Sequence, residues 1–365
     1  MKNSLGTSVI LTLAGESHGE MICAVLDGIA PGVPVDEGFI ARQLQIRRPA
    51  GPTDTARREP DPFRIVSGVL DGFSTGAPIT ILIPNTDVRS ADYDALANVP
   101  RPSHADYTAQ VKYGGFQDKR GGGHFSGRVT VGLVAAGAIA LDALRRKGVH
   151  VGTHILECGG VRDVPFDDCG GELPAQIEKV SSMDFPLISD VRGAMEEAVL
   201  AARANADSVG GIVQTAVCGL PAGVGEPWFG SLDGELANAL FSIGGIKGVE
   251  FGAGFRMAGM KGSEANDAFC ISDGRIATRT NRNGGINGGI SNGMPLIINS
   301  VVKPTPSIGQ PQDSVDMQEL KELKLQIPGR HDPAIVRRVC VVVSSMVALV
   351  LCDLLALRFG TDYLR

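Results

Sequence analysis

Apolar runs of strand length alternate with polar turns in the first part of the chain. Four of these runs are rich in aliphatic residues and are bounded by turn residues: 7–13, 21–27, 65–69 and 78–83. Between the second and third runs, Phe39, Ile40 and Leu44 recur at the spacing of one helical face. The pattern therefore predicts a helix over 36–44 that ends in the Arg-Arg-Pro sequence at 47–49. Strands and helices that alternate in this way favour a mixed α/β fold.

Two longer apolar runs predict buried helices. Residues 129–145 form a run that Gly148 ends, and residues 339–352 carry no formal charge. Ser344 interrupts the second run and Asp353 ends it. A run of this length indicates a buried helix rather than a membrane span, which needs about 20 apolar residues.

Two further helices are predicted from local signals. Ser189 is a candidate N-cap for a helix with Met195, Val199 and Ala202 on one face. A second helix is expected over 314–325. Residues 165–183, which lie between the apolar run 129–145 and Ser189, are expected to be irregular.

The second half of the chain repeats blocks of the first half in the same order. GVLDGFSTGAPITI (68–81) and GINGGISNGMPLII (285–298) match at several Gly, Ser, Pro and Ile positions with an offset of 217 residues. GIAPGV (28–33) similarly matches GLPAGV (219–224) with an offset of 191. A helical segment follows the shorter block in each half. Matches of Gly and Pro also arise by chance, but three ordered blocks favour an internal repeat.

The repeat predicts the domain organisation. We expect one large α/β domain, layered as a β-α-β sandwich, with pseudo-two-fold halves at about 5–150 and 209–357. The chain of 365 residues is long enough for a sizeable core, since 43% of it is hydrophobic.

One polar stretch, residues 101–128, is the strongest candidate for chemistry. It contains His104 and His124 and almost no branched aliphatic residues, so it cannot form core. The triglycine 121–123 allows close approach of a ligand, and Ser126 precedes a predicted helix. A glycine loop before a helix, with cations nearby, is typical of an anion site. The alternative is a surface loop rich in turn residues.

Composition and charge restrict the ligand class. The net charge is −6 although arginines cluster locally, which fits a small anionic ligand better than nucleic acid. The 48 glycines, about 13% of the chain, indicate many tight turns and backbone-lined sites. The seven cysteines form no CxxC pair, and the N-terminus lacks a signal-peptide pattern, so we expect reduced thiols in a cytoplasmic protein without a membrane span.

Histidine spacing gives no reason to expect a metal. His150 and His154 are four residues apart, but they lie in a segment with strand periodicity and have no third ligand nearby. We therefore assign them structural roles. His18 differs, because it follows a strand directly and lies between glycines in a turn, where sites gather; a turn histidine without function is the alternative.

Two more loops in the second half carry candidate residues. Lys303 follows a predicted strand, and Pro304 and Pro306 would hold Thr305 and Ser307 in an extended path. Near the last helix, Asp332 follows Arg330 and His331, although an acid there could also serve only the helix dipole.

Many motifs in the same order resemble those of chorismate synthases over nearly the whole chain. They are GESHG (15–19), RRP (47–49), RREPD (57–61), NTD (85–87), RPSHADY (101–107), KYG (112–114), RGGG with S.R (120–128), GLPAGVGEP (219–227), GGI.GGIS.G (284–293), KPTPSI (303–308) and GRHDP (329–333). The order and number of these motifs make the resemblance specific.

The resemblance implies an activity and its cofactor. Chorismate synthases convert 5-enolpyruvylshikimate 3-phosphate to chorismate, in the shikimate pathway to the aromatic amino acids, by 1,4-anti elimination of phosphate. They require reduced FMN although the reaction is redox-neutral. The alternatives are another FMN-dependent enzyme, which would change the redox state of its flavin in each turnover, and a phosphometabolite-binding protein without catalysis.

The resemblance also implies residue roles. His18 would protonate or steady the departing phosphate, His104 would protonate the reduced flavin, and Asp332 would take part in removing the C6 proton. Ser17 and Ser126 are included among the catalytic residues. The substrate's anionic groups would be bound by four arginines: Arg47, Arg48, Arg128 and Arg338.

The implied flavin contacts map to several loops. They are His124, Phe125, Ser126, Gly244, Gly245, Gly288, Lys303, Pro304, Thr305, Pro306, Ser307 and Arg330. The chain departs from the usual family pattern at 124–125 and 244–245, two places where the family contacts flavin or NADPH. The resemblance further implies a homotetramer. Because no extra domain is present, we expect an external reductase to supply the reduced flavin.

Overall fold

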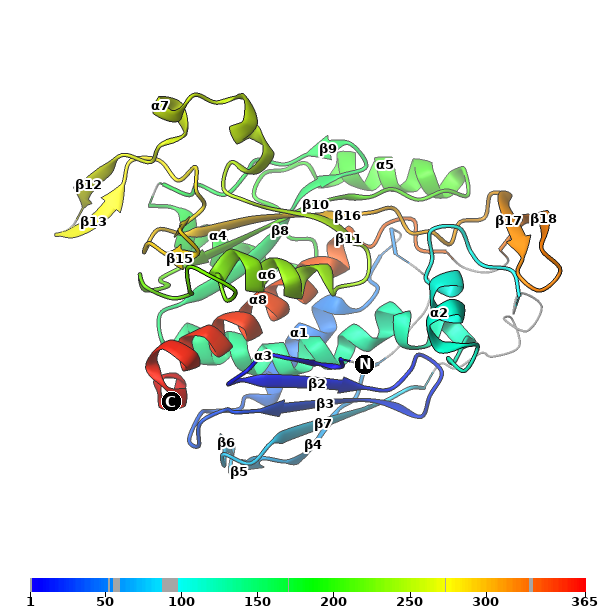
Figure 1. The fold of residues 1–365 in the computed structure, drawn as a ribbon, viewed down its shortest axis with the longest axis horizontal. Coiled ribbons are helices and arrows are strands. Elements are labelled where there is room, and N and C mark those ends of the chain that lie inside the picture. The colour runs from blue at the N-terminus through cyan, green and yellow to red at the C-terminus, as the bar shows by residue number, and fades with distance from the viewer. Residues whose placement is uncertain are drawn as a thin grey trace.

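The computed structural model describes the 365-residue chain except residues 1, 52, 55–59, 87–97, 170, 273 and 328–330. Two antiparallel five-stranded sheets enclose a central layer of helices (Figure 1). In spatial order, the first sheet comprises β1 (Ser4–Leu5), β2 (Ile10–Ala14), β3 (Met21–Asp27), β7 (Ile79–Pro84) and β4 (Arg64–Ser67). The second comprises β11 (Ile246–Phe251), β16 (Leu296–Val302), β10 (Gly211–Cys218), β8 (His150–Cys158) and β9 (Val161–Arg162).

Four helices fill the space between the sheets (Figure 1). They are α1 (Glu37–Arg47), α3 (Thr130–Arg146), α6 (Leu232–Phe241) and α8 (Val336–Phe359). Helix α3 packs on β3 and β7, α8 packs on β8 and β10, and the two helices pack against each other. Two more helices, α4 (Leu173–Ser181) and α5 (Arg192–Ala204), pack against the second sheet. The predicted layered α/β fold is confirmed.

Short elements project from this body or connect its layers. They are β5 (Val69–Leu70), β6 (Phe73–Ser74), α2 (Asp106–Tyr113), η2 (Arg120–Phe125), η3 (Gly127–Val129), η4 (Gly254–Gly259), α7 (Gly262–Ala265), β12 (Phe269–Ser272), β13 (Arg275–Thr278), β14 (Ile286–Asn287), β15 (Ile290–Ser291), β17 (Gln312–Asp316), β18 (Lys321–Leu325) and η5 (Thr361–Leu364). Elements α2, η2 and η3 lie within the polar stretch 101–128.

The hydrophobic pattern explains which faces point inward. Along β3, Ile22, Ala24 and Leu26 are at most 1% exposed, whereas the alternate residues are partly exposed. Asp36 caps the N-terminus of α1, and its carboxylate accepts a hydrogen bond from the Phe39 amide at 2.9 Å. The first sheet therefore buries one face against the helices.

The two apolar helices form the centre of the core. The helical stretch Gly127–Arg146 and α8 are long and apolar enough to cross a membrane, but 83% and 94% of their most apolar windows are buried inside the protein. Burial in the core explains their composition without a membrane. The prediction of buried helices at 129–145 and 339–352 is confirmed.

Some local predictions were wrong. Residues 314–325 belong to the β17–β18 hairpin rather than a helix, because their backbone pairs across a turn and with residues 98–100. The Ser314 hydroxyl donates to the Pro100 carbonyl at 2.6 Å, and the Met317 amide donates to the Asn98 carbonyl at 2.9 Å. These tertiary contacts outweigh local helix propensity.

The expected cap at Ser189 was also wrong. Helix α5 starts at Arg192, and the Ser189 hydroxyl instead donates to the buried Asp163 carboxylate at 2.5 Å. Asp163 also lies 3.3 Å from His154, which is fully buried on β8 as a structural residue. The segment 165–183, expected to be irregular, contains α4.

The two halves share the same strand register at equivalent positions. In the β5–β6 hairpin Val69 pairs with Ser74, and in the β14–β15 hairpin Ile286 pairs with Ser291, each 217 positions further along the chain. In the sheets that follow, Leu26 pairs with Ile79 and, in the second half, β10 pairs with β16 in the corresponding register.

The two hairpin serines make matching hydrogen bonds. The Ser74 hydroxyl accepts from the Val33 amide at 2.9 Å, and the Ser291 hydroxyl accepts from the Val224 amide at 2.9 Å. Each hydroxyl then donates to a backbone carbonyl three residues before that valine, at 2.5 and 2.7 Å. The motif matches therefore correspond to equivalent local structures.

The α3–α8 crossing depends on a glycine, which gives a stability test. A Cβ at Gly137 would lie 2.3 Å from the Ser345 Cβ and 2.8 Å from its Cα. Alanine favours a helix by about 1 kcal/mol over glycine, but overpacking costs about 1–3 kcal/mol or more where backbone must move. A contact this close to backbone places the cost at the upper end of this range, so we expect Gly137→Ala to lower the free energy of unfolding by about 2 kcal/mol in urea denaturation.

A second helical glycine is the control. A Cβ at Gly193 in α5 would meet nothing within 4 Å, so Gly193→Ala should be neutral or slightly stabilising. If Gly137→Ala were as stable as Gly193→Ala, the close crossing would not be a constraint on the core.

Candidate active site

Most of the predicted site residues gather at one end of the sandwich. The turn after β2, the end of α1, the η2–η3 segment and the segment after β16 all reach this end, at the right in Figure 1. Because these loops come from both halves of the chain, the site depends on how the two sheets are held around the central helices.

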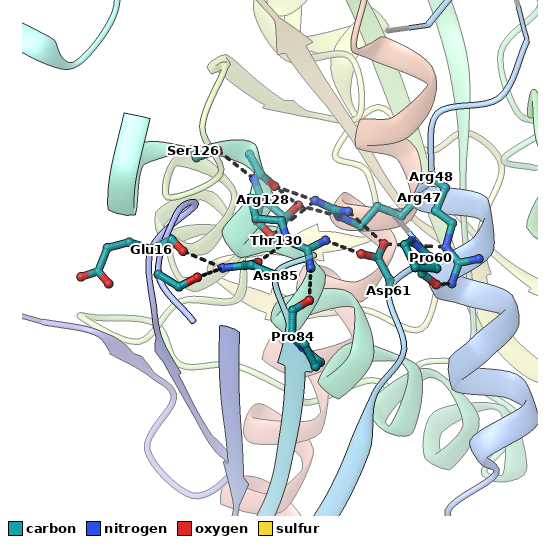
Figure 2. A network of polar contacts seen from close by, with 12 residues as sticks. Glu16, Arg47, Arg48, Pro60, Asp61, Pro84, Asn85, Ser126, Arg128 and Thr130 are labelled. Atoms are coloured by element: carbon teal, nitrogen blue, oxygen red, sulfur yellow. Dashed lines mark hydrogen bonds and ion pairs between the residues drawn. The ribbon is translucent and has the colours of Figure 1, made fainter. Parts of the chain in front are cut away.

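A buried ion pair between Arg128 and Asp61 lies at the centre of this region (Figure 2). The Arg128 side chain is 4% exposed and the Asp61 side chain 1%. Arg128 also donates from Nε to the Asn85 Oδ1 at 2.8 Å and from its other terminal nitrogen to the Pro84 carbonyl at 3.0 Å. The guanidinium is thus fixed by the end of β7 and by the loop before β4.

Two more arginines face the same carboxylate. Arg47 lies 3.5 Å and Arg48 lies 3.8 Å from the Asp61 Oδ2. Arg47 also donates to the Thr130 hydroxyl at 2.9 Å and to the Gly127 carbonyl at 2.8 Å (Figure 2). Three guanidinium groups that converge on one carboxylate are an arrangement suited to binding an anionic ligand.

Asn85 connects the arginine cluster to the His18 turn. Its side-chain amide donates to the Glu16 carbonyl at 3.0 Å and to the Gly19 carbonyl at 2.8 Å, while its oxygen accepts from Arg128 (Figure 2). Both sides of the turn that carries His18 are therefore tied to the same residue that orients Arg128.

The triglycine loop brings the two candidate histidines together. A Cβ at Gly121 would lie 2.1 Å from the His18 Nδ1, and a Cβ at Gly122 would lie 3.5 Å from the His104 Cε1. Both glycines have positive φ, at 59° and 83°, which favours glycine, and at Gly121 the contact with His18 also leaves no room for a Cβ. His18 and His104 consequently lie against consecutive residues of one loop.

Ser17 and Ser126 flank this loop. Ser17 is 1% exposed, and its hydroxyl has no hydrogen-bond partner in the part of the chain that the structure describes. A buried hydroxyl of this kind is suited to a ligand or a water molecule. The Ser126 hydroxyl accepts from the Arg128 amide at 3.2 Å and so caps the η3 turn instead.

A second arginine–carboxylate cluster holds Asp332. Its carboxylate accepts from Arg338 at 2.5 Å, and Arg338 also lies 3.9 Å from the buried Asp54. Asp54 accepts at 2.5 Å from Arg337, which donates to the Arg48 carbonyl at 2.7 Å as well. Arg337 thus links the two clusters.

The segment after β16 adjoins the His104 loop. The Lys303 ammonium donates to the Ser103 carbonyl at 2.5 Å, and the Lys303 amide donates to the Gly245 carbonyl at 2.9 Å. Burial lowers the pKa of Lys303 from its ordinary value, and the nearby Lys247 lowers it further. The Thr305 hydroxyl donates to the Asp332 carbonyl at 2.5 Å, so these cofactor candidates share one region.

Not every candidate lies there. Gly288 lies in the β14–β15 hairpin, at the opposite end of β16 from Lys303, and Arg330 lies outside the described residues, as do Arg57 and Arg58. A strand as long as β16 separates its ends by about 20 Å. Phe125 is partly exposed and packs edge-on against Tyr113 with ring centroids 6.2 Å apart.

Sequence reasoning missed the residues that hold the arginines and the histidine turn in place. They are Asp54, Asp61, Asn85, Asp106 and Arg337. Three of them lie in the quoted motifs RREPD, NTD and RPSHADY, which was the available signal.

Groups of three or more acidic, histidine or cysteine residues suited to a metal were not found within the described residues. A hollow of about 420 Å³ beside Arg48 and Asp61 lies against the start of α1.

Comparison with known proteins identifies one family. The family model described as chorismate synthase matches residues 9–356. The chorismate synthase of Thermococcus gammatolerans is 44% identical over 97% of each chain, and that of Methanocella arvoryzae is 46% identical over 96% of this chain and 93% of its own. A crystal structure of a chorismate synthase has a TM-score of 0.76 at 27% identity, covering 97% of this chain and 94% of its own.

The Asp61 ion pair gives a test by substitution with asparagine. Asp61 has a positive φ of 46°, which Asn tolerates, so Asp61→Asn removes the charge without straining the backbone. It leaves the surrounding arginines without this countercharge, and loss of one partner of a buried pair costs about 3–5 kcal/mol. We expect a loss of unfolding free energy in this range by urea denaturation, partly restored by sulfate, which would replace the missing anion.

Asp142→Asn is the matched control. Asp142 also bonds two arginines, but Arg145 and Arg146 are 59% and 48% exposed and far from the loop cluster along α3. This variant should lose less than about 1 kcal/mol and gain nothing further from sulfate. Equal losses in the two variants, or no sulfate effect in Asp61→Asn, would contradict the anion-site interpretation.

Proposed function

The chain belongs to the chorismate synthase family, and we propose that His18, His104 and Asp332 carry out the family's reaction at the end of the sandwich described above. The protein is a carbon–oxygen lyase that forms chorismate from 5-enolpyruvylshikimate 3-phosphate in the shikimate pathway. The observation that carries the residue assignment is the contact of His18 and His104 with consecutive glycines beside the arginine cluster.

Substrate binding is assigned to Arg47, Arg48, Arg128 and Arg338. The substrate carries a phosphate and two carboxylates, and guanidinium groups bind such anions through paired hydrogen bonds. In the protein, Asp61 and Asp332 hold these arginines in position without the substrate. Preorganised cations lower the entropic cost of binding a compact ligand with three anionic groups.

His18 is assigned to the leaving phosphate. It is 6% exposed, in a turn that Asn85 ties to Arg128. Among side chains, histidine most readily changes charge near neutral pH, so it can donate a proton to the departing oxygen or remain beside it as a cation. The adjacent arginines would then share the negative charge that develops on the phosphate.

The loops beside His104 fit a reduced FMN. A Cβ at Gly244 would meet nothing within 4 Å, the side chains at 303–307 supply an ammonium and two hydroxyls, and the backbone of Gly122 lies against the His104 ring. When bound there, reduced FMN would supply electron density to the substrate transiently without net oxidation. His104 would hold or deliver a proton at the flavin, and the Asp332 carboxylate would accept the proton from the substrate's C6.

The same assignment has consequences for how subunits assemble and for how reduced flavin is supplied. We infer a homotetramer, as the family resemblance implies, and the distance of Gly288 from the other flavin candidates supports a second subunit supplying this residue. An external reductase, using NADPH or another donor, would provide reduced FMN. The seven free cysteines support a reducing cytoplasmic location.

We also propose that the single domain arose from two equivalent units, at about 5–150 and 209–357. The shared hairpin registers and the matching bonds of Ser74 and Ser291 support this organisation. One consequence is functional, because each half contributes different loops to the same end of the sandwich.

The two histidine roles predict different spectra. His18→Ala and His104→Ala should each slow anaerobic phosphate release with chemically reduced FMN by about 10²–10⁴-fold, the usual contribution of general acid catalysis. His104→Ala should also alter the reduced-flavin absorption spectrum in the ternary complex, whereas His18→Ala should leave it nearly unchanged. Stopped-flow absorbance with a phosphate assay measures both.

The wild-type protein supplies the control. It should release no phosphate in air with NADPH and FMN alone, and should become active once FMN is reduced chemically. Wild-type turnover by His18→Ala would exclude its leaving-group role and favour Arg48 or Arg338. Turnover by the pure protein with NADPH in air would exclude an external reductase.

A further inference from the structure

We propose that Asp106, held by Arg101, is the positioning residue that keeps the proton of neutral His104 on Nδ1 and leaves Nε2 as the nitrogen that exchanges protons in the site. This inference rests on the proposed function of His104. Asp106 itself contacts the ring rather than the reacting atoms.

Both carboxylate oxygens of Asp106 are held by hydrogen bonds. Its Oδ1 lies 2.7 Å from the His104 Nδ1. Arg101 donates to it through two nitrogens on one edge of the guanidinium, from Nε to Oδ2 and from a terminal nitrogen to Oδ1, each at 2.8 Å. The Arg101 amide adds a third bond, to Oδ2 at 3.0 Å. The carboxylate therefore has little freedom to rotate away from the ring.

The charge state of Asp106 determines the tautomer. Burial raises the pKa of Asp106, but hydrogen bonds from Arg101 and His104 lower it by more, so the pKa lies well below its usual range. An ionised carboxylate only accepts hydrogen bonds, so the His104 Nδ1 must carry the hydrogen. The Arg101 nitrogen 3.0 Å from Nδ1 is also a donor. One of its two hydrogens goes to Asp106, and an Nδ1 that carries a hydrogen cannot accept the other.

The other ring nitrogen faces the triglycine loop. A Cβ at Gly122 would lie 3.6 Å from the His104 Nε2. Nε2 is thus on the side of the ring where the proposed cofactor loops meet, while Nδ1 points back to the start of α2. A neutral ring held in this way can accept a proton only at Nε2, and a charged ring can donate to the site only from there.

Arg101 connects this arrangement to the second half of the chain. It lies 3.5 Å from the Ser307 hydroxyl, and Lys303 binds the carbonyl of Ser103 in the same turn. The ring is therefore oriented relative to the 303–307 segment as well as to Gly122. Asp106 therefore takes part in orienting the His104 ring, a role that the pattern of charges in the sequence does not reveal.

Asp106→Asn tests the proposal, because an amide can donate to Nδ1 and so favour the opposite tautomer. In ¹⁵N-histidine-labelled protein, the His104 imidazole signals should change from the Nδ1–H form to the Nε2–H form or a mixture. With substrate and reduced FMN, kcat should fall by about 10²–10⁴-fold, with KM changed little. This is the usual loss when a histidine lacks the hydrogen-bond partner that fixes its orientation and tautomer. Asp106→Glu should restore part of kcat.

A double variant separates positioning from a structural role. If Asp106 acts through His104, the combined His104→Ala and Asp106→Asn variant should be no slower than His104→Ala alone. Asp142→Asn, which removes another arginine-bound carboxylate, should leave both the imidazole signals and kcat unchanged.

The outcomes distinguish this inference from the proposed function. Unchanged His104 signals in Asp106→Asn, or additive losses in the double variant, would overturn the positioning role. Full activity of His104→Ala together with a tautomer change in Asp106→Asn would instead remove the catalytic role of His104 and leave the tautomer assignment standing.

Discussion

The buried pair of Asp61 and Arg128 is the interaction on which the site depends. A cluster of arginines binds an anionic substrate well, but without a countercharge it would repel itself in the folded protein. Asp61 supplies that countercharge and is nearly inaccessible to water. Arg128, fixed in this way, orients Asn85, and Asn85 holds the turn of His18. Charge neutralisation, substrate recognition and placement of a catalytic group are therefore one connected network.

The packing of the core makes this network possible. Helices α3 and α8 approach closely at Gly137, which sets the distance between the two sheets. Loops from both halves then meet at one end of the sandwich, the first half providing His18, His104 and the triglycine, and the second providing Lys303 and Asp332. Two similar halves with different loops give an asymmetric site.

The sequence predicted the strands and the buried helices and named candidate site residues, but not how the loops that carry those residues are supported. Apolar periodicity and glycine punctuation specify β3 and α8 because burial there is local in sequence. The β17–β18 hairpin and the role of Ser189 depend on distant partners at 98–100 and Asp163, which no local pattern contains. Asp61, Asn85 and Asp106 lay in recognised motifs, but their contacts with Arg128 and His104 exist only in the folded chain.

The most direct test is a crystal structure grown without oxygen, with 5-enolpyruvylshikimate 3-phosphate and FMN bound. We expect the phosphate among Arg47, Arg48 and Arg128, within hydrogen-bond reach of His18. We also expect the flavin beside Gly122 and the Nε2 of His104, on the other side of the triglycine loop from the phosphate. A phosphate bound elsewhere, or both histidines directed at the same ligand, would contradict the assignment of one proton-transfer role to each side of this loop.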